Sequence, residues 1–297
     1  APWLQENNLY AKMYPACFWA DLTSPVTNLN PKTGMMSVMD VRMAETRSFA
    51  RVARFAFKMP WRLLTAKESA CSIMREDGCT PGIPKGGMRF SPIFHGLSSA
   101  FGTSMTSSSA ALRYGRSDAV NARRAVRLSF RDCVFSGFGQ NGIIASEGRN
   151  MTIDGCRFRD FGYHAMRIGS GDRKTLTGGR TFIQNCDVSC AGWWKSDFAF
   201  AACVDGCGAT LRWNYFHDVP AATIRLNGND MMLASNVFER CDYEAGDNGA
   251  VDIYANPTHA SRIIHNVFRN CGSKDVGFVE AGHAGVRFDD AVSNQIV

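Results

Sequence analysis

The amino-acid sequence predicts an all-β fold: a right-handed parallel β-helix, or β-solenoid, preceded by a β-rich N-terminal segment. Three observations lead to this prediction. A short signature recurs six times after residue 125, apolar and polar residues alternate within each repeat, and Gly, Asn and Asp punctuate every repeat. Repeats of this length indicate a solenoid or an array. Alternation with a period of two indicates strands rather than helices.

Each repeat has an anchor residue that is followed two positions later by an apolar residue, in most cases phenylalanine. Successive anchors lie 22 to 30 residues apart, which suits a coil of two or three short strands. Coils of a β-solenoid stack at the interstrand distance of about 4.8 Å, so equivalent residues lie directly above one another. We therefore expect a thiol ladder that continues as an asparagine ladder, formed by Cys133, Cys156, Cys186, Asn214, Asn236 and Asn266. Cys241 and Cys271 each follow their anchor by five residues and are expected to stack as well.

The chain is predicted to have two parts. Residues 1–110 are less regular and are expected to form a β-rich N-terminal segment, with the Ser- and Gly-rich stretch 98–110 as a linker. Residues 111–297 are expected to form the β-helix, with about six or seven coils. The last residues, "SNQIV", look like the first strand of another coil. The chain is thus expected to be a fragment, to be capped at its C-terminal coil by a partner protein, or to continue beyond this sequence.

Composition limits the classes of partner. The chain has 297 residues, a net charge of +6 and 45% hydrophobic residues, which is typical of a soluble globular protein. No apolar run is long enough for a transmembrane segment. The basic residues lack interleaved aromatics, so no nucleic-acid partner is expected. The eleven cysteines and six histidines show no spacing typical of metal ligands, so we expect buried thiols, no metal and no cofactor.

A later strand in each coil is expected to place polar side chains on the outer face. Successive side chains of a strand point to opposite faces, so equivalent residues align into columns. One column contains Arg167, Arg225, Asp252 and Arg287, and the next contains Gly169, Asn227, Tyr254 and Asp289. The first column is equally compatible with a ladder of surface ion pairs.

Three aspartates lie where carboxylates of adjacent coils would meet. Asp289 falls beside Tyr254, Asp290 lies at the strand end, and Asp247 lies on the loop that enters the neighbouring strand. Such carboxylates would be about 5 Å apart, close to the separation used by retaining glycosidases. Alternatively, aspartates at solenoid corners accept backbone N–H bonds and have a structural role.

Several segments together resemble a known family. They are "GSGDRKTLTGG" (169–179), "NYFHDVPAATIRLNGND" (214–230), "GDNGAVDIY" (246–254), "HNVFRNCG" (265–272) and "GVRFDDAVSN" (285–294). In order and spacing they are similar to the β-helix glycoside hydrolase family that contains fucosidase and xylanase activities, over residues 115–297. Residues 18–38 also resemble the N-terminal β segment of that family.

The resemblance implies roles for particular residues. Asp247, with Asp289 or Asp290, would supply the acid and the nucleophile, and Asp172 and Arg173 would lie on a loop near the substrate. It also implies an extracellular or secretory-pathway protein. The family has aromatic residues where this chain has Asp252 and Arg287, so an ion pair is expected to replace two stacked rings, with the loss of an aromatic platform for sugars.

Three functions follow as alternatives. The favoured one, with enzymatic activity left open, is a glycoside hydrolase-like protein that acts on a polysaccharide or oligosaccharide. Its substrate would be bound by Asp172, Arg173, Arg225, Asp252, Tyr254 and Arg287. The second is a non-catalytic glycan-binding or structural β-helix in a larger assembly. The third is a polysaccharide lyase, whose base would be Arg173, Lys174, Arg225 or Arg287.

Overall fold

The computed structural model describes residues 118–297 except 197, 255–259, 273–281, 291 and 294, together with the strands that precede residue 118. The chain divides into two units, Ala1–Gly86 and Gly87–Val297, and each is described by itself. No helix in the described part of the chain is long and apolar enough to span a membrane.

The first unit contains an antiparallel sheet of five strands in the order β4-β3-β2-β1-β5. The β-rich segment predicted ahead of the solenoid thus contains the strands β1 (Leu9–Met13), β2 (Leu22–Asn30), β3 (Met35–Val38), β4 (Phe57–Lys58) and β5 (Cys71–Arg75).

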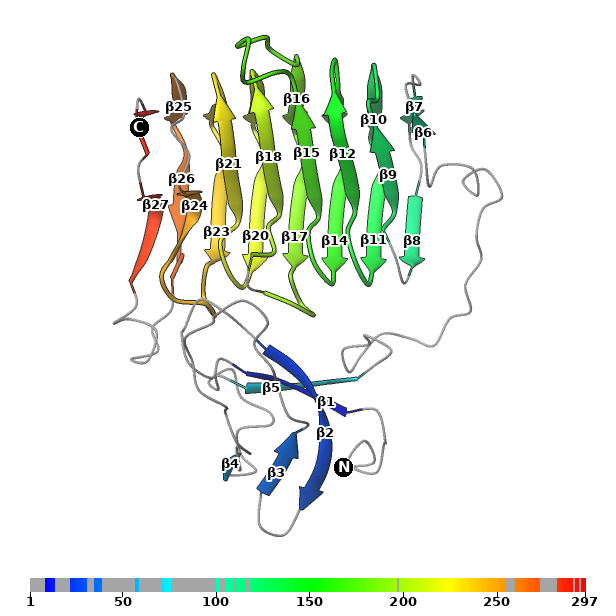
Figure 1. Cartoon of the computed structure of the whole chain (residues 1–297), viewed down its shortest axis with the longest axis vertical. Helices are drawn as coiled ribbons and strands as arrows, with labels where there is room; N and C mark the ends of the chain where they lie inside the picture. The colour runs from blue at the N-terminus through cyan, green and yellow to red at the C-terminus, as the bar shows by residue number, and fades with distance from the viewer. Residues whose placement is uncertain are drawn as a thin grey trace. The chain divides into compact units, whose positions relative to one another are not determined.

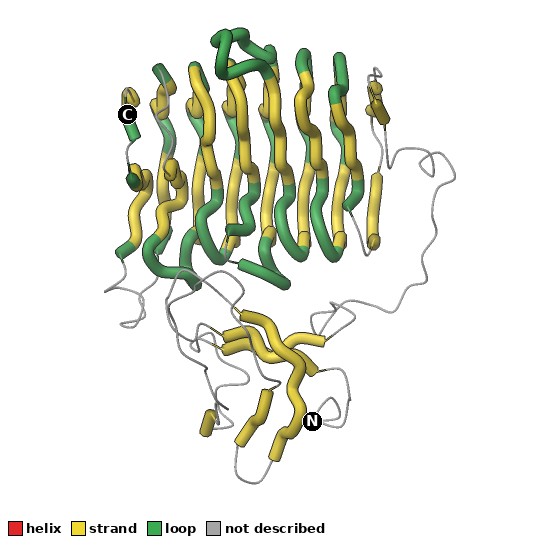
Figure 2. The backbone as a smooth tube through the Cα atoms, viewed as in Figure 1, coloured by secondary structure: helices red, strands yellow, loops and turns green. Residues whose placement is uncertain are grey.

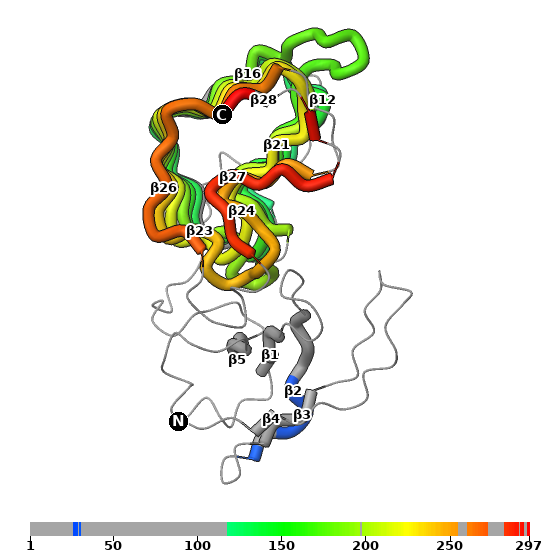
Figure 3. Tube along the Cα trace, turned by 90° about the vertical axis from the view of Figure 1, so that its left-hand side faces the viewer, coloured from blue at the N-terminus to red at the C-terminus, as the bar shows by residue number. Residues whose placement is uncertain are grey.

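The second unit is a solenoid of three parallel sheets, which confirms the predicted right-handed parallel β-helix (Figures 1 and 2). The chain passes through sheets I, II and III in turn, and the coils lie behind one another in the view along the axis (Figure 3). Sheet I contains β6 (Ala100–Phe101), β9 (Val120–Arg123), β12 (Ile143–Gly148), β15 (Met166–Ser170), β18 (Ala202–Cys207), β21 (Ile224–Asn229), β24 (Asn248–Tyr254) and β27 (His283–Asp289).

Sheet II contains β7 (Met105–Ser108), β10 (Leu128–Arg131), β13 (Thr152–Asp154), β16 (Thr181–Gln184), β19 (Ala209–Arg212), β22 (Met232–Ala234), β25 (Ser261–Ile264) and β28 (Gln295–Ile296). Sheet III contains β8 (Ala111–Gly115), β11 (Val134–Phe138), β14 (Arg157–Phe161), β17 (Asp187–Ala191), β20 (Tyr215–Val219), β23 (Val237–Cys241) and β26 (Val267–Arg269). The strands β6 and β7, within the stretch expected to be a linker, already pair with β9 and β10.

The apolar position of the repeat forms a continuous column inside sheet III. Its members pair in register from coil to coil, and they are Phe135, Phe158, Val188, Phe216, Phe238 and Phe268. The rings of Phe135 and Phe158 stack at 4.8 Å, and those of Phe238 and Phe268 at 4.9 Å. This column contributes strongly to the stability of the core, because full burial of one phenylalanine stabilises the fold by about 2 to 3 kcal/mol.

The predicted asparagine ladder is confirmed. Asn214 Nδ2 donates to Asn236 Oδ1, and Asn236 Nδ2 donates to Asn266 Oδ1, both at 2.9 Å. Each amide also donates to a carbonyl of the preceding coil, as Asn236 does to Leu211 at 3.1 Å. Buried amides require such bonding. The thiols of Cys133, Cys156 and Cys186 continue the ladder and are all buried.

Two corners of the coil have left-handed backbone in coil after coil. The residue before each anchor has a positive φ, and these residues are Asp132, Gly155, Asn185, Trp213, Ser235 and His265. The residue four after each anchor does too, at Gly137, Asp160, Cys190, Asp218, Arg240 and Asn270. Asn, Asp and Gly adopt this conformation at least cost, which explains their recurrence in the sequence.

The last described coil has exposed apolar side chains. Phe288, Ile296 and Val297 have 44%, 53% and 69% of their surface exposed. A partner protein at this coil stays a prediction.

Candidate functional site

The outer face of sheet I has the columns that the sequence predicts. Pairing in register gives Arg167, Cys203, Arg225, Asp252 and Arg287 in the first column. Tyr254 pairs with Asp289 in the second. The strand β18, which the sequence pattern did not align, contributes Cys203 and Asp205. The parallel register therefore collects charged residues from different coils on one face.

Arg287 joins two of the predicted catalytic aspartates. Its Nη2 lies 2.8 Å from Asp247 Oδ1 and 2.9 Å from Asp289 Oδ2. Both oxygens contact the same nitrogen. The distance between Asp247 Oδ1 and Asp289 Oδ2 therefore cannot exceed the sum of these two contact distances. Asp247 reaches this position from the loop before β24, where its φ is +56° and its backbone N–H donates to Gly282 O at 3.0 Å. Two carboxylates of adjacent coils thus meet at one guanidinium.

Asp290, the third predicted catalytic residue, lies directly after β27. It has a φ of +48° and an exposed side chain. The strand β27 ends at Asp289. Side chains alternate along a strand, so Asp290, the first residue of the turn, does not belong to the column that contains Asp289. The contacts of Arg287 therefore distinguish Asp289 from its neighbour.

Asp252 lies in the predicted column but is not open to a substrate. Its side chain is fully buried, between Arg225 and Arg287. It accepts a hydrogen bond from Arg225 Nη2, and its Oδ1 lies 3.7 Å from Arg287 Nη1. The ion pair expected in place of two stacked rings is present. The predicted role of Asp252 in substrate binding stays a prediction, and its carboxylate is enclosed. Burial raises the pKa of Asp252, and the two arginines oppose that shift.

A second buried carboxyl, Asp242, lies near this network. Asp242 Oδ2 lies 3.1 Å from His283 Nδ1, and burial raises the pKa of Asp242 to about 6 against the lowering effect of the hydrogen bond with His283. Oδ1 of Asp242 and of Asp252, Nε of Arg225 and Nε2 of His283 have no hydrogen-bond partner within the described part of the chain. Buried polar atoms of this kind are normally bonded to ordered water. Nothing in the sequence pattern indicated the burial of Asp242.

Three aromatic rings surround the guanidinium of Arg225. Its Cζ lies 5.2 Å from the ring centroid of Phe200, 5.5 Å from that of Tyr254 and 5.9 Å from that of Phe198. Phe200 is buried in a small apolar cluster with Cys203 and Ala222, and Phe198 and Tyr254 are 45% and 44% exposed. Phe198 belongs to the loop between β17 and β18. Sequence reasoning missed it because this coil is irregular.

The predicted loop residues Asp172 and Arg173 follow β15, at the opposite strand end from Asp247. Asp172 Oδ1 accepts from the backbone N–H of Lys174 at 2.8 Å, a bond that lowers the pKa of Asp172. Arg173 Nε donates to Asn229 Oδ1 at 2.8 Å, at the end of β21. These contacts brace the loop, and they do not bring it to the Asp247–Asp289 pair.

The same face is hollowed further toward the N-terminal coils. A cavity of about 540 Å³ is lined by Asp118, Asn121, Asn141, Ile144, Ala145, Ser146, Tyr163, His164, Arg167, Gly169 and Asp205. His164 Nδ1 accepts from the Phe200 N–H at 3.0 Å, and burial lowers the pKa of His164 to about 3. The imidazole is therefore neutral, with its proton on Nε2.

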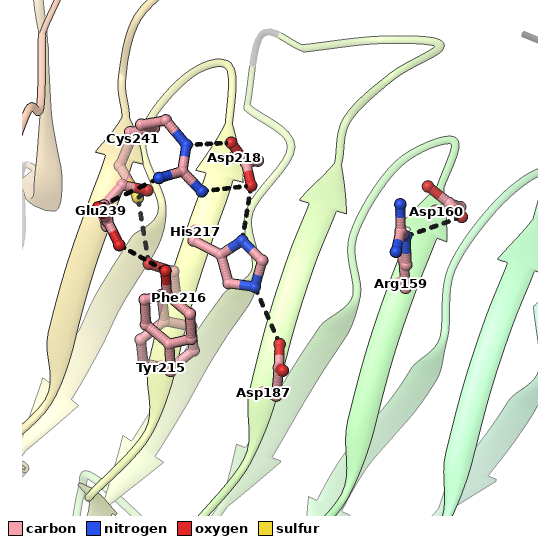
Figure 4. A network of polar contacts seen from close by, with 10 residues as sticks. Arg159, Asp160, Asp187, Tyr215, Phe216, His217, Asp218, Glu239 and Cys241 are labelled. Carbon is pink, nitrogen blue, oxygen red and sulfur yellow. Dashed lines mark hydrogen bonds and ion pairs between the residues drawn. The ribbon is translucent and has the colours of Figure 1, made fainter.

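A separate charged cluster lies on the outer face of sheet III (Figure 4). His217 Nε2 lies 3.0 Å from Asp187 Oδ1, and its Nδ1 lies 2.6 Å from Asp218 Oδ2. Arg240 donates to Asp218 at 2.6 and 2.9 Å and, with His217, lowers the pKa of Asp218 to about 2. Its members come from β17, β20 and β23. We interpret this cluster as a brace between coils.

Comparison with known proteins decides the family. Residues 112–296 match the family described as the right-handed β-helix region. The chain belongs to this family. No curated protein matches the β-helix chain. A solved structure named "Glycoside hydrolase" matches with 17% sequence identity and a TM-score of 0.41, over 57% of this chain and 41% of that one. The β-helix chain thus spans less than half of that protein, and the activity in its name is that protein's own.

Proposed function

We propose that this β-helix protein is a glycoside hydrolase acting on an oligosaccharide or polysaccharide, with Asp247 and Asp289 as its catalytic pair. The observation that supports the proposal is the shared contact of both carboxylates with Arg287 Nη2. The two groups come from different coils, and Asp247 and Asp289 retain 47% and 28% of their side-chain exposure. A carboxylate pair that is close together and reachable from solvent is what glycosidic cleavage requires.

The spacing favours the retaining mechanism. Inverting enzymes keep their carboxyl groups about 6.5 to 9.5 Å apart to admit a water molecule, and retaining enzymes about 5 to 5.5 Å apart. Two oxygens that contact the same nitrogen fit the closer separation. One carboxylate then attacks the anomeric carbon while the other, as an acid, protonates the leaving oxygen, and water later releases the sugar. Arg287 positions both groups.

The test is a set of Asp→Asn variants. Asp247→Asn and Asp289→Asn should each lower turnover of aryl glycosides and polysaccharides by about a hundredfold or more, because a positioned carboxyl group is lost. Asp290→Asn is the matched control, since it makes the same change one residue along, and it should keep wild-type turnover. Equal turnover in all four proteins would refute the assignment.

A non-catalytic glycan-binding protein is the second candidate. The engagement of Asp247 and Asp289 with Arg287 favours it, because both carboxylates already form ion pairs within the protein. Binding of glycans without any hydrolysis by the wild-type chain would support this function and exclude the first.

A further inference from the structure

Two exposed aromatic rings lie near Arg225, and one of them, Tyr254, lies beside Asp289 of the candidate catalytic pair. Tyr254 is the register partner of Asp289, and both Tyr254 and Phe198 face Arg225. Tyr254 and Phe198 each expose almost half of their surface, whereas Phe200, on the third side of the guanidinium, is 4% exposed. Large exposed rings in a rigid setting are stacking surfaces. The platform expected to be lost at 252 and 287 is thus replaced by rings from other positions.

The arginines of this face are already engaged by acidic partners. They pair as Arg123 with Glu147, Arg167 with Asp205, Arg225 with Asp252, and Arg287 with Asp247 and Asp289. The loop residue Arg173 is bonded to Asn229. A sugar carboxylate at Arg225 or Arg287 would have to compete with a carboxylate that is already paired with that arginine.

The charge around the site disfavours anions as well. Among the described residues, Asp242, Asp247, Asp252 and Asp289 are accompanied by Arg225, Arg287 and His283. Carboxyl groups outnumber cations in this set, and like charges repel one another. A uronate would therefore be disfavoured at this site, because Arg225 and Arg287 already contact carboxylates.

We infer that the site binds a neutral sugar chain whose rings stack on Phe198 and Tyr254, and that it rejects uronates. Where this glycan would be cleaved depends on the proposed function. Its binding depends only on the two exposed rings and the paired arginines. Phe198 and Tyr254 are thus assigned as specificity-determining residues for a neutral glycan.

The experiment is equilibrium binding of oligosaccharides to the full chain by calorimetry. The probes are neutral oligosaccharides of glucose, xylose, mannose and galactose, and an oligogalacturonide of equal length. At least one neutral probe should bind, and Phe198→Ala and Tyr254→Ala should each weaken it by about tenfold, which corresponds to the loss of one stacked ring. Phe198→Tyr and Tyr254→Phe keep a ring and should restore the affinity.

Matched controls come from exposed aromatics on the opposite side of the coil. Trp213 and Phe182 are 53% and 39% exposed and belong to the sheet II side, so Trp213→Ala and Phe182→Ala should bind as wild type does. Tightest binding of the oligogalacturonide, equal losses in the control variants, or no binding of any probe would overturn the inference. Neutral binding without hydrolysis leaves the inference standing and removes only the hydrolase proposal. Hydrolysis that Phe198→Ala and Tyr254→Ala leave unchanged removes only the inference.

Discussion

Replacing Asp242 by asparagine should change how the stability of the protein depends on pH. Asp242 is fully buried, and its pKa is raised from 3.8 to about 6. The folded state therefore binds this proton more tightly than the unfolded state does. The resulting stabilisation is full below about pH 4 and is lost as the pH rises through about 6. A shift of about two pKa units corresponds to about 3 kcal/mol.

The assay is urea-induced unfolding of wild type and Asp242→Asn between pH 4 and pH 7. Other groups titrate in this range, so the informative quantity is the difference between the two proteins at each pH. Relative to the variant, wild type should lose about 2 kcal/mol of unfolding free energy as the pH rises from 4 to 7, since part of the full difference lies below pH 4. Parallel curves for the two proteins would refute the account of Asp242. His283→Gln keeps a hydrogen-bonding side chain but cannot become charged, so it should move the loss to higher pH.

Three further substitutions test the packing of the solenoid by chemical denaturation. Asp252→Asn leaves Arg225 buried without its charged partner and should cost about 3 kcal/mol; a cost below about 1 kcal/mol would mean that the pair is not buried. Asn236→Ala removes the central member of the amide ladder and should cost about 3 kcal/mol. This cost should exceed that of Asn266→Ala, at the half-buried end of the ladder, and a larger cost for Asn266→Ala would contradict the ladder. Phe158→Ala empties a fully buried position and should cost about 3 to 5 kcal/mol, and a smaller loss would show that the core rearranges.

The repeat made the solenoid and its ladders predictable. A parallel register places equivalent residues of successive coils in contact, so a periodic sequence determines which residues stack. The amide ladder from Asn214 to Asn266 and the pairing of Tyr254 with Asp289 both follow from spacing alone. The same reasoning placed Asp247 near Asp289, because one loop enters the strand next to the other.

The surroundings of these residues were not predictable, because irregular loops and side-chain directions determine them. Alternation assigns Asp252 to the outer face but cannot reveal that its carboxylate is buried. Phe198 lies in a stretch whose pattern did not align with the other coils, and so its ring near Arg225 was missed. Arg287 was assigned to substrate binding, whereas its contacts with Asp247 and Asp289 depend on side-chain directions that periodicity does not specify.

The anomeric configuration of the first product tests the central claim most directly. Proton NMR during hydrolysis of a neutral aryl glycoside by the wild-type chain distinguishes the two anomers before they equilibrate. Asp247 and Asp289 contact one nitrogen of Arg287, so their contacting oxygens lie closer together than the separation that inverting enzymes keep. The account therefore predicts that the released sugar retains its configuration. A product with inverted configuration, or no hydrolysis of any neutral aryl glycoside, would contradict the account.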